Sequence, residues 1–272
     1  MLKRTITAVV AILFVFVPVI YFSDTIVFPI AMALMSLIGS YEMMSCVGLK
    51  NNYLLLAISM AFGGFIPFIP WFTDGMDTAV ITFLSISVYL IVYMVIFVFS
   101  KGKTDYSYFT YSFFGVFYTA ISFESIVLIR ELRPSLYILV FIGPWISDTF
   151  AYLCGRLFGR HKLIPEVSPK KTVEGAVGAI VLTAASTILY VFILSKINHT
   201  PIEYNLFIIA IVGAVISIIS QVGDLTASAI KRKFGIKDYG FLFPGHGGVL
   251  DRFDSVIFTA IILLNIILLK II

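Results

Sequence analysis

Apolar segments long enough to cross a bilayer recur along the whole length of this chain. A transmembrane helix needs about 20 consecutive, mainly apolar residues. The sequence predicts nine such spans, at residues 5–22, 25–45, 53–72, 78–99, 108–129, 135–154, 173–195, 205–223 and 253–270. Only 12% of the 272 residues are charged, whereas soluble domains usually contain about 25%. The predicted fold is therefore an all-α polytopic membrane protein of about nine transmembrane helices.

The first span follows two basic residues, Lys3 and Arg4, as a signal peptide would. Its apolar run is too long for a typical signal peptide and no small-residue cleavage site follows Phe22, so we expect a retained helix. Cys46 and Cys154 lie in or beside spans and imply no disulfide framework. We expect residues 1–134, with spans 1–5, to serve packing or dimerisation, and residues 135–272 to form the catalytic region.

The distribution of Lys and Arg predicts the orientation, because cytoplasmic loops carry an excess of both. With a cytoplasmic N-terminus and nine crossings, fifteen Lys and Arg residues fall inside and four fall outside. A single miscounted span would mix the two sets. The asymmetry therefore favours nine spans with the N-terminus in the cytoplasm, in the cell (inner) membrane.

Carboxylates gather at the cytoplasmic ends of the last four predicted spans. Ionisable groups in or beside a span are costly, by at least about 2.5 kcal/mol at a helix centre, so their convergence suggests a function. Two basic loops, residues 155–172 and 224–252, lie at the same face. The acidic residues are Asp148, Glu174, Asp224, Asp251 and Asp254.

Carboxylates beside basic loops favour a divalent cation that holds a polyphosphate. Mg²⁺ takes one or two carboxylates together with phosphate oxygens and water, and Lys and Arg offset the remaining phosphate charge. The segment PGHGG, Pro244 to Gly248, allows a turn that a ligand can approach closely, and its backbone N–H groups could add donors. This pattern predicts an anionic, metal-linked substrate at the membrane surface.

Other interpretations of single residues stay open. A structural ion pair explains any one of the carboxylates as well as a ligand role does, although five together are harder to explain in this way. Basic loops also serve topology and contacts with anionic lipids. His246 could be a turn residue, orient a phosphate or handle a proton. The phosphate-loop, HExxH and CxxC motifs are absent.

The C-terminal half resembles the CTP:phosphatidate cytidylyltransferases, also called CDP-diacylglycerol synthases. The resemblance covers roughly residues 143–255, and Val173 is its one departure, where an aromatic residue is expected. Spans 1–5 agree only in being hydrophobic. The matching stretches are Asp148-Thr149, Ser168-Pro-Lys-Lys-Thr172, Glu174-Gly175, Gly223-Asp224-Leu225, Ser228-x-x-Lys231-Arg232, Lys237-Asp238, Pro244-Gly-His-Gly-Gly248 and Asp251-Arg252-Phe253-Asp254.

The resemblance implies a Mg²⁺-dependent transfer of CMP from CTP to phosphatidic acid by a polytopic membrane enzyme that is often a homodimer, and some members of the family also use K⁺. It makes Asp224 and Asp251 the leading metal ligands, with Asp148 and Asp254 in support. The catalytic candidates are Asp224, Asp251, His246, Lys231 and Arg252. The substrate-binding candidates are Ser168, Lys170, Lys171, Thr172, Glu174, Ser228, Arg232, Lys237, Asp238, Gly247 and Gly248.

Two other functions would also account for some of these features. An ion-coupled transporter would place its acidic residues near the bilayer midplane, within paired repeats, and the sequence shows no repeat. A cytidylyltransferase for another lipid phosphate would use the same headgroup chemistry and differ only in the apolar spans. A nucleic acid is not among the expected partners, which are CTP, phosphatidic acid and the lipid bilayer.

Overall fold

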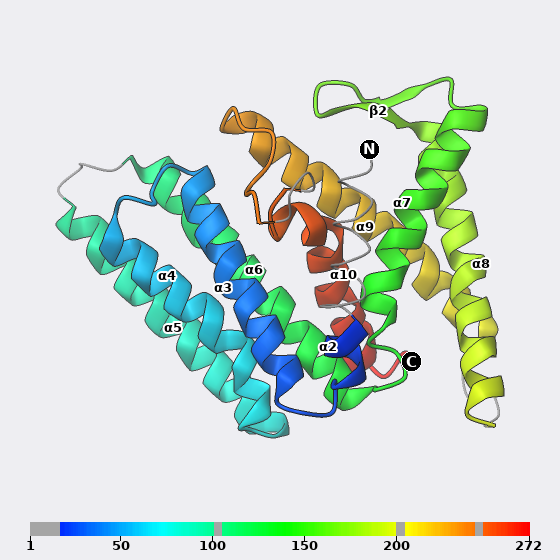
Figure 1. Ribbon diagram of the computed structural model, residues 1–272, viewed down its shortest axis with the longest axis horizontal. Helices are drawn as coiled ribbons and strands as arrows, with labels where there is room; N and C mark the ends of the chain where they lie inside the picture. The colour runs from blue at the N-terminus through cyan, green and yellow to red at the C-terminus, as the bar shows by residue number, and fades with distance from the viewer. Residues whose placement is uncertain (1–16, 101–104, 200–204, 243–246) are drawn as a thin grey trace. The chain divides into compact units, whose positions relative to one another are not determined.

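The computed structural model describes residues 17–100, 105–199, 205–242 and 247–272, and nearly all of its regular structure is helical (Figure 1). This architecture agrees with the predicted all-α class. A short antiparallel hairpin, β1–β2, lies in the basic loop between α7 and α8. The elements are α2 (Val17–Tyr21), α3 (Val27–Cys46), α4 (Tyr53–Phe65), the 3₁₀ helix η2 (Ile66–Trp71), α5 (Gly75–Phe99), α6 (Tyr106–Leu132), α7 (Leu139–Phe158), β1 (Lys162–Ile164), β2 (Ser168–Thr172), α8 (Val173–Ile197), α9 (Leu206–Lys233) and α10 (Leu250–Leu268).

Within the described part of the chain, six helical segments are long and apolar enough to cross a membrane. α7 and α10, which were also predicted as spans, are 20 and 19 residues long. Most of the first predicted span lies outside the described residues, so the count of nine stays a prediction. The six segments are Val27–Cys46, Tyr53–Trp71, Gly75–Phe99, Tyr106–Leu132, Val173–Ile197 and Leu206–Lys233.

The eighth predicted span ends at residue 223, but the helix that contains it, α9, continues to Lys233. The stretch after Gly223 has no helix-breaking residue until Gly235, which has a positive φ of 67° and suits the end of a helix. Asp224 therefore lies inside a helix and projects from a regular backbone. Similarly, α4 gives way to the 3₁₀ helix η2 where Pro67 and Pro70 remove backbone donors.

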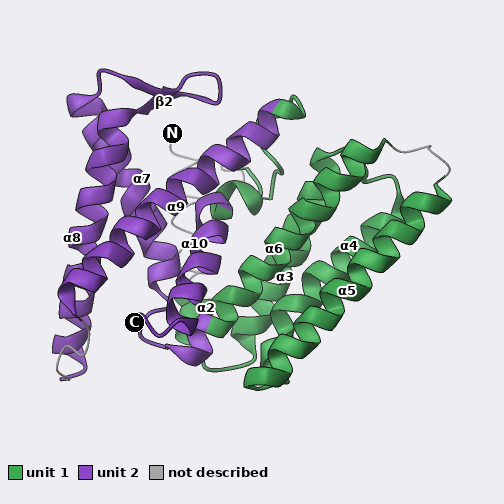
Figure 2. Cartoon of the chain, turned by 180° about the vertical axis from the view of Figure 1, so that it is seen from behind, with its two compact units in different colours: residues 1–128, 233–253 green, residues 129–232, 254–272 purple. Residues whose placement is uncertain are grey.

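The chain divides into two compact units, which are described separately (Figure 2). Unit 1 contains residues 1–128 and 233–253, and unit 2 contains residues 129–232 and 254–272. The functional division at residue 134 stays a prediction.

Hydroxyl groups join the helices of unit 1 across their apolar core. The hydroxyl of Tyr89 in α5 lies 3.3 Å from the hydroxyl of Ser59 in α4. The hydroxyl of Tyr93, also in α5, lies 2.5 Å from the hydroxyl of Ser112 in α6. The ring of Tyr89 also stacks on Phe62 at 4.1 Å between centroids. Hydrogen bonds of this kind help transmembrane helices to associate, because lipid offers no hydrophobic force between them.

Unit 2 is organised around the long contact between α7 and α8. The hydroxyl groups of Ser147 in α7 and Ser217 in α9 lie 2.8 Å apart. The side-chain amide of Gln221, one turn further along α9, donates to the backbone oxygen of Ala176 in α8 at 3.4 Å. Small and polar residues thus join the three helices.

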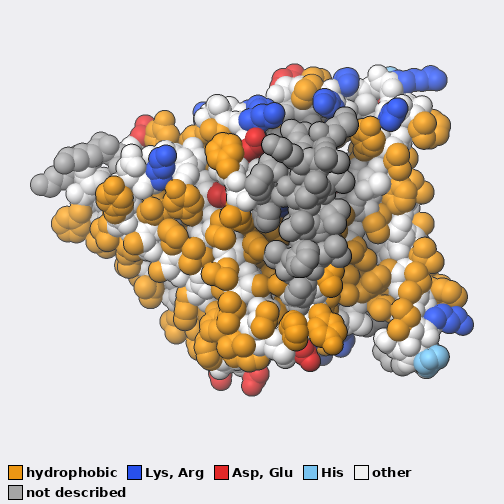
Figure 3. Space-filling view, viewed as in Figure 1, with side chains coloured by type: hydrophobic (Ala, Val, Ile, Leu, Met, Phe, Trp, Pro, Cys, Tyr) orange, Lys and Arg blue, Asp and Glu red, His pale blue; other side chains and the backbone are white. Residues whose placement is uncertain are grey.

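The surface has the character expected of a protein in lipid. Figure 3 shows hydrophobic side chains over the flanks of the helices, with Lys and Arg side chains gathered near helix ends. Along α5, Phe83 is 67% exposed and Val98 is 69% exposed. In water such a continuous apolar flank would be costly, whereas in a bilayer it is the contact surface.

Candidate active site

The β1–β2 hairpin and the start of α8 position two of the predicted substrate-binding lysines. The hairpin lies at the end of α7 and α8 (Figure 1), and its strand β2 carries Lys170 and Lys171. Thr172 is the N-cap of α8, and its Oγ1 atom accepts a hydrogen bond from the backbone N–H of Gly175 at 3.2 Å. A capping threonine fixes where the helix begins and thereby where the lysines before it lie.

Glu174 is engaged with the loop before the hairpin. Its carboxylate accepts hydrogen bonds from the backbone N–H groups of Arg160 at 3.0 Å and His161 at 3.2 Å. The Nδ1 atom of His161 lies 2.6 Å from the same carboxylate. These contacts give Glu174 a role in holding the hairpin, and the substrate contact predicted for it stays a prediction.

Glycines allow α7 and α8 to cross closely below the hairpin. A Cβ atom at Gly175 would lie 2.6 Å from the backbone oxygen of Ala151. A Cβ atom at Gly178 would lie 2.6 Å from the sulfur of Cys154. Small residues at such crossings let transmembrane helices approach closely. This crossing keeps α7, and with it Asp148, against α8.

A second close approach brings α9 against α10. A Cβ atom at Gly223 would lie 2.7 Å from the backbone oxygen of Asp254 and 3.2 Å from the Cα atom of Ser255. Only glycine fits there without a shift of one helix. Because Asp224 follows Gly223 directly, this contact also sets the position of Asp224 relative to Asp254.

The result is a group of charged side chains within unit 2, which we call the aspartate cluster: Asp148, Asp224 and Asp254. The charges of all three interact with one another. The Nζ atom of Lys171 forms an ion pair with Oδ2 of Asp224, and the charge of Lys231 acts on Asp254. Three helices and one hairpin strand therefore bring acidic and basic groups near one another, and the ligand roles predicted for these residues stay predictions.

The hydroxyl of Ser228 also reaches this cluster, since it lies one turn after Asp224 on α9. It donates to Oδ1 of Asp224 at 3.4 Å. Both oxygens of the Asp224 carboxylate thus have a partner within unit 2. Such a carboxylate is held in one orientation, which a ligand-binding role requires.

The donor chemistry of the cluster suits Mg²⁺. All of its acidic donors are carboxylate oxygens, which this ion prefers, and Mg²⁺ in proteins often takes only one or two of them and completes its coordination with phosphate and water. Within the described ranges, no group of three His, Cys, Asp or Glu side chains converges closely enough to hold a metal ion by itself. The residues fit a metal whose remaining ligands come from a bound polyphosphate.

The glycine-rich turn and Asp251 belong to unit 1. Gly247 has a positive φ of 84°, a conformation that glycine adopts without strain. The Oδ2 atom of Asp251 accepts hydrogen bonds from the backbone N–H groups of Tyr239 at 2.7 Å and Gly248 at 2.9 Å. The N–H of Gly248 is thus already donated within the protein, so Asp251 holds the backbone at Gly248. The predicted role of Asp251 as a metal ligand stays a prediction.

Glu42 is a residue of this region that the sequence analysis did not single out. It lies near the end of α3, is only 3% exposed, and accepts hydrogen bonds from the backbone N–H groups of Val249 and Leu250. The available signal was a lone acidic residue within an otherwise apolar predicted span, and such residues are often functional. Its partners are distant in sequence, so the signal did not reveal what it binds.

The remaining predicted residues lie at the surface or outside the described ranges. Ser168 is partly buried on strand β2. His246 falls outside the described residues, so its predicted role is not addressed by the structure. The exposed residues are Lys170, Arg232, Lys237, Asp238 and Arg252.

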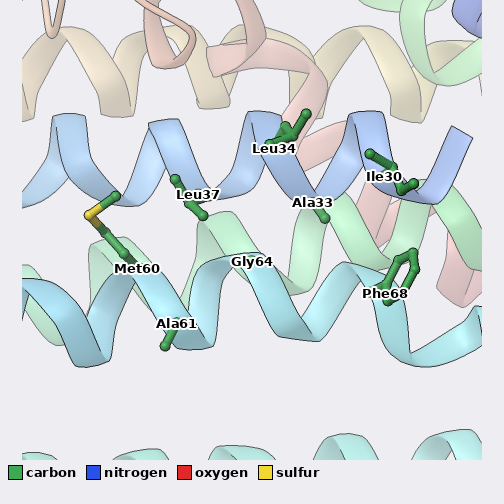
Figure 4. A pocket seen from close by; sticks show the side chains of 8 residues that line it. All are labelled: Ile30, Ala33, Leu34, Leu37, Met60, Ala61, Gly64 and Phe68. Carbon is green, nitrogen blue, oxygen red and sulfur yellow. The ribbon is translucent and has the colours of Figure 1, made fainter. Parts of the chain in front are cut away.

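A groove of about 360 Å³ between α3 and the α4–η2 segment contains none of the predicted site residues (Figure 4). It is lined by apolar side chains such as Leu34, Met60 and Phe68, and by Gly64. Such a surface suits hydrocarbon and offers nothing to a nucleotide. The charged residues described above are therefore the candidate active site.

The chain is similar to a known family over nearly its whole length. The model of the cytidylyltransferase family matches residues 2–270. A phosphatidate cytidylyltransferase of Staphylococcus haemolyticus is 32% identical over 98% of both chains. One of Staphylococcus saprophyticus is 33% identical over 98% of this chain and 99% of the relative. A phosphatidate cytidylyltransferase of Staphylococcus aureus is 33% identical over 98% of both chains. The chain therefore belongs to the cytidylyltransferase family.

Proposed function

We propose that this protein transfers CMP from CTP to phosphatidic acid and releases CDP-diacylglycerol and pyrophosphate. The observation that carries the proposal is the aspartate cluster with its paired Lys171, in a chain that matches phosphatidate cytidylyltransferases along nearly its full length. Carboxylates and lysines at the ends of apolar helices suit a reaction between a lipid headgroup and a soluble nucleotide.

In this reaction a phosphate oxygen of phosphatidic acid forms a bond to the α-phosphorus of CTP. The bond from that phosphorus to the oxygen that bridges to the β-phosphorus breaks, and its electron pair leaves with pyrophosphate. The attacking oxygen is already an anion, so no strong general base is needed. The difficulty is charge, because two anions must approach each other, and the protein has to offset it.

Basic side chains in the candidate site can offset this charge. The ammonium of Lys171 is held by Asp224, so a phosphate oxygen that reaches this pair meets a fixed positive charge. Lys231, one helix turn after Ser228 in the same helix α9, brings a second one near Asp254. Lys170, Arg232, Lys237 and Arg252 are further candidates for phosphate contacts, and His246 for orienting a phosphate or protonating the leaving pyrophosphate.

We also propose that Mg²⁺ is required, with Asp224 and Asp251 as leading ligands and Asp148 and Asp254 in support. When bound, Mg²⁺ would supply positive charge to the phosphate oxygens and help to align the reacting groups. The family resemblance further supports K⁺ as a second ion and a homodimer as the assembly. The excess of Lys and Arg in alternate loops supports nine spans, a cytoplasmic N-terminus and a site that faces the cytoplasm.

The test uses purified full-length protein in detergent micelles with phosphatidic acid and each of the four nucleoside triphosphates, labelled in turn at the α-phosphate. We expect label to enter the lipid phase with CTP and Mg²⁺, and to stop when a chelator is added. Label transfer to another lipid phosphate, but not to phosphatidic acid, would change the substrate. No transfer with any nucleotide or lipid phosphate, in well-folded protein, would overturn the proposal.

A further inference from the structure

The carboxylate of Glu42 is buried against the start of α10. Both of its oxygens accept a backbone hydrogen bond: Oε1 from the N–H of Val249 at 2.9 Å and Oε2 from that of Leu250 at 2.8 Å. The first N–H groups of any helix lack partners within the helix, and negative charge is favourable beside them. Glu42 thus caps α10 from a helix more than 200 positions earlier in the chain.

Two glycines, Gly240 and Gly248, fit around this carboxylate. A Cβ atom at either Gly240 or Gly248 would overlap with Oε1 of Glu42. The backbone can approach the carboxylate this closely only where there is no side chain. The glycine at each position is therefore explained by Glu42.

Asp251 completes the arrangement from the other side of the same turn. Its Oδ2 atom binds the N–H groups of Tyr239 and Gly248, while Glu42 binds the next two along the chain. Three successive backbone N–H groups, from Gly248 to Leu250, are thus held by two buried carboxylates. This fixes the turn, and it fixes the direction in which the first turn of α10 presents its side chains.

We propose that Glu42 is a positioning residue for the transfer reaction: it holds the turn from Gly247 to Leu250 so that Asp251 and Arg252 present their charged groups to the nucleotide. The inference rests on the proposed function. It also assigns a task at the site to α3, which belongs to the region that the sequence analysis reserved for packing or dimerisation.

The test compares Glu42→Gln with Glu124→Gln in the full-length protein. Glutamine at residue 42 keeps one acceptor oxygen and turns an N–H₂ group toward a backbone N–H. Glu124 is the matched control, because it is also a buried acid of unit 1 and binds only the side chain of Thr82 in the neighbouring helix α5 among its described contacts. Glu124→Gln should lower the unfolding temperature and leave the kinetic constants within about twofold, since it touches none of the turn.

For Glu42→Gln we expect kcat/KM for CTP to fall by about tenfold or more, the effect of losing one hydrogen bond to a charged group. The KM for CTP should rise, while the KM for phosphatidic acid should stay within about twofold. A merely structural role would reduce the amount of active protein, which lowers the maximal rate and leaves both KM values unchanged. That result would overturn the proposal.

A double variant supplies an independent test. Gly248→Ala alone should lose activity, because the added Cβ meets the Glu42 carboxylate. Glu42→Ala removes the obstacle together with the cap, so Glu42→Ala/Gly248→Ala should be no less active than Glu42→Ala. If the two losses simply multiply, the residues do not act through one turn and the proposal fails.

Backbone amide hydrogen exchange tests the role of Glu42 independently of whether the protein transfers CMP. The amides of residues 248–250 should exchange faster in Glu42→Gln than in wild type or Glu124→Gln, whether or not CTP is turned over. Unchanged exchange would overturn the role of Glu42. If wild type transferred no CMP, the proposed function would fall, and the exchange result would still decide whether Glu42 holds the turn.

Discussion

The Nζ atom of Lys171, on strand β2, forms an ion pair with Oδ2 of Asp224, in the C-terminal part of α9. Both side chains are partly buried, with 19% and 28% of their surfaces exposed. The pair joins the two basic loops predicted from the sequence through a single contact. It places a cation and the leading candidate for metal binding next to each other, as a site for a metal-linked phosphate requires.

Asp224→Asn should abolish turnover. Asparagine matches the shape of aspartate but removes the charge that both Lys171 and a metal ion would bind, so we expect a loss of at least about 100-fold, of the order found when a key electrostatic group is removed. The measurement is CTP-dependent labelling of lipid, with size-exclusion profiles of the solubilised protein to check its fold. Thr226→Ala is the control on the same helix, because the hydrogen bond described for its hydroxyl goes to the backbone oxygen of Val222 and not to the aspartate cluster. Near-normal activity of Asp224→Asn would remove this residue from the metal site.

Much of the fold could be predicted from the sequence, because lipid imposes a strong pattern. Uninterrupted apolar stretches have one stable form in a bilayer, the helix, so the positions of α3 to α10 followed from hydropathy alone. The end of α9 did not, since the polar stretch from Asp224 to Lys233 has no apolar pattern and yet continues the helix. The hairpin of residues 162–172 was also missed, because strands of only three and five residues form when a partner strand lies beside them, which the sequence of either strand does not show.

The candidate site was predicted in part for a similar reason. Charges at the ends of spans stand out against an apolar background, which is why Asp148, Lys171 and Asp224 could be named together. Glu42 did not stand out as a partner of the turn, because its bonds go to backbone N–H groups of residues 249 and 250. Backbone donors carry no sequence signal. The hydrogen bond that Asp251 accepts from the backbone N–H of Tyr239 was hidden for the same reason.

Asp251→Asn and Asp251→Ala together should separate the two roles open to this residue. Asparagine retains an oxygen that can accept the hydrogen bonds from Tyr239 and Gly248, whereas alanine loses both. If Asp251 binds metal, both variants should be inactive, and Asn should keep a higher unfolding temperature than Ala. Substantial activity in Asp251→Asn alone would limit Asp251 to holding the turn.

Gly223→Ala should weaken the contact between α9 and α10. The new Cβ would lie 2.7 Å from a backbone oxygen that cannot move aside, and overpacking of this kind costs about 1–3 kcal/mol. We expect a lower unfolding temperature and a loss of activity, since Asp224 and Asp254 flank the contact.

Gly64→Ala is the matched control for this change. Its Cβ would meet only the flexible side chain of Leu37 at 3.2 Å. Alanine in a helix is favoured over glycine by about 0.5–1 kcal/mol, so stability should stay level or rise slightly. Equal destabilisation by both substitutions would contradict the special role of Gly223.

Asp254→Asn should change the dependence of the reaction on Mg²⁺ more than its maximal rate. Asp254 is held near Asp224 by the packing of α9 and α10, and as a supporting ligand it contributes charge that draws the ion into the site. Removing that charge should raise the Mg²⁺ concentration needed for half-maximal rate by about tenfold, the equivalent of about 1.4 kcal/mol, and high Mg²⁺ should restore most of the activity. The measurement is a Mg²⁺ titration of CMP transfer after treatment with a chelator, with Thr226→Ala as the reference. An unchanged midpoint would exclude Asp254 from the metal site, and it would leave Asp148 as the supporting ligand within unit 2.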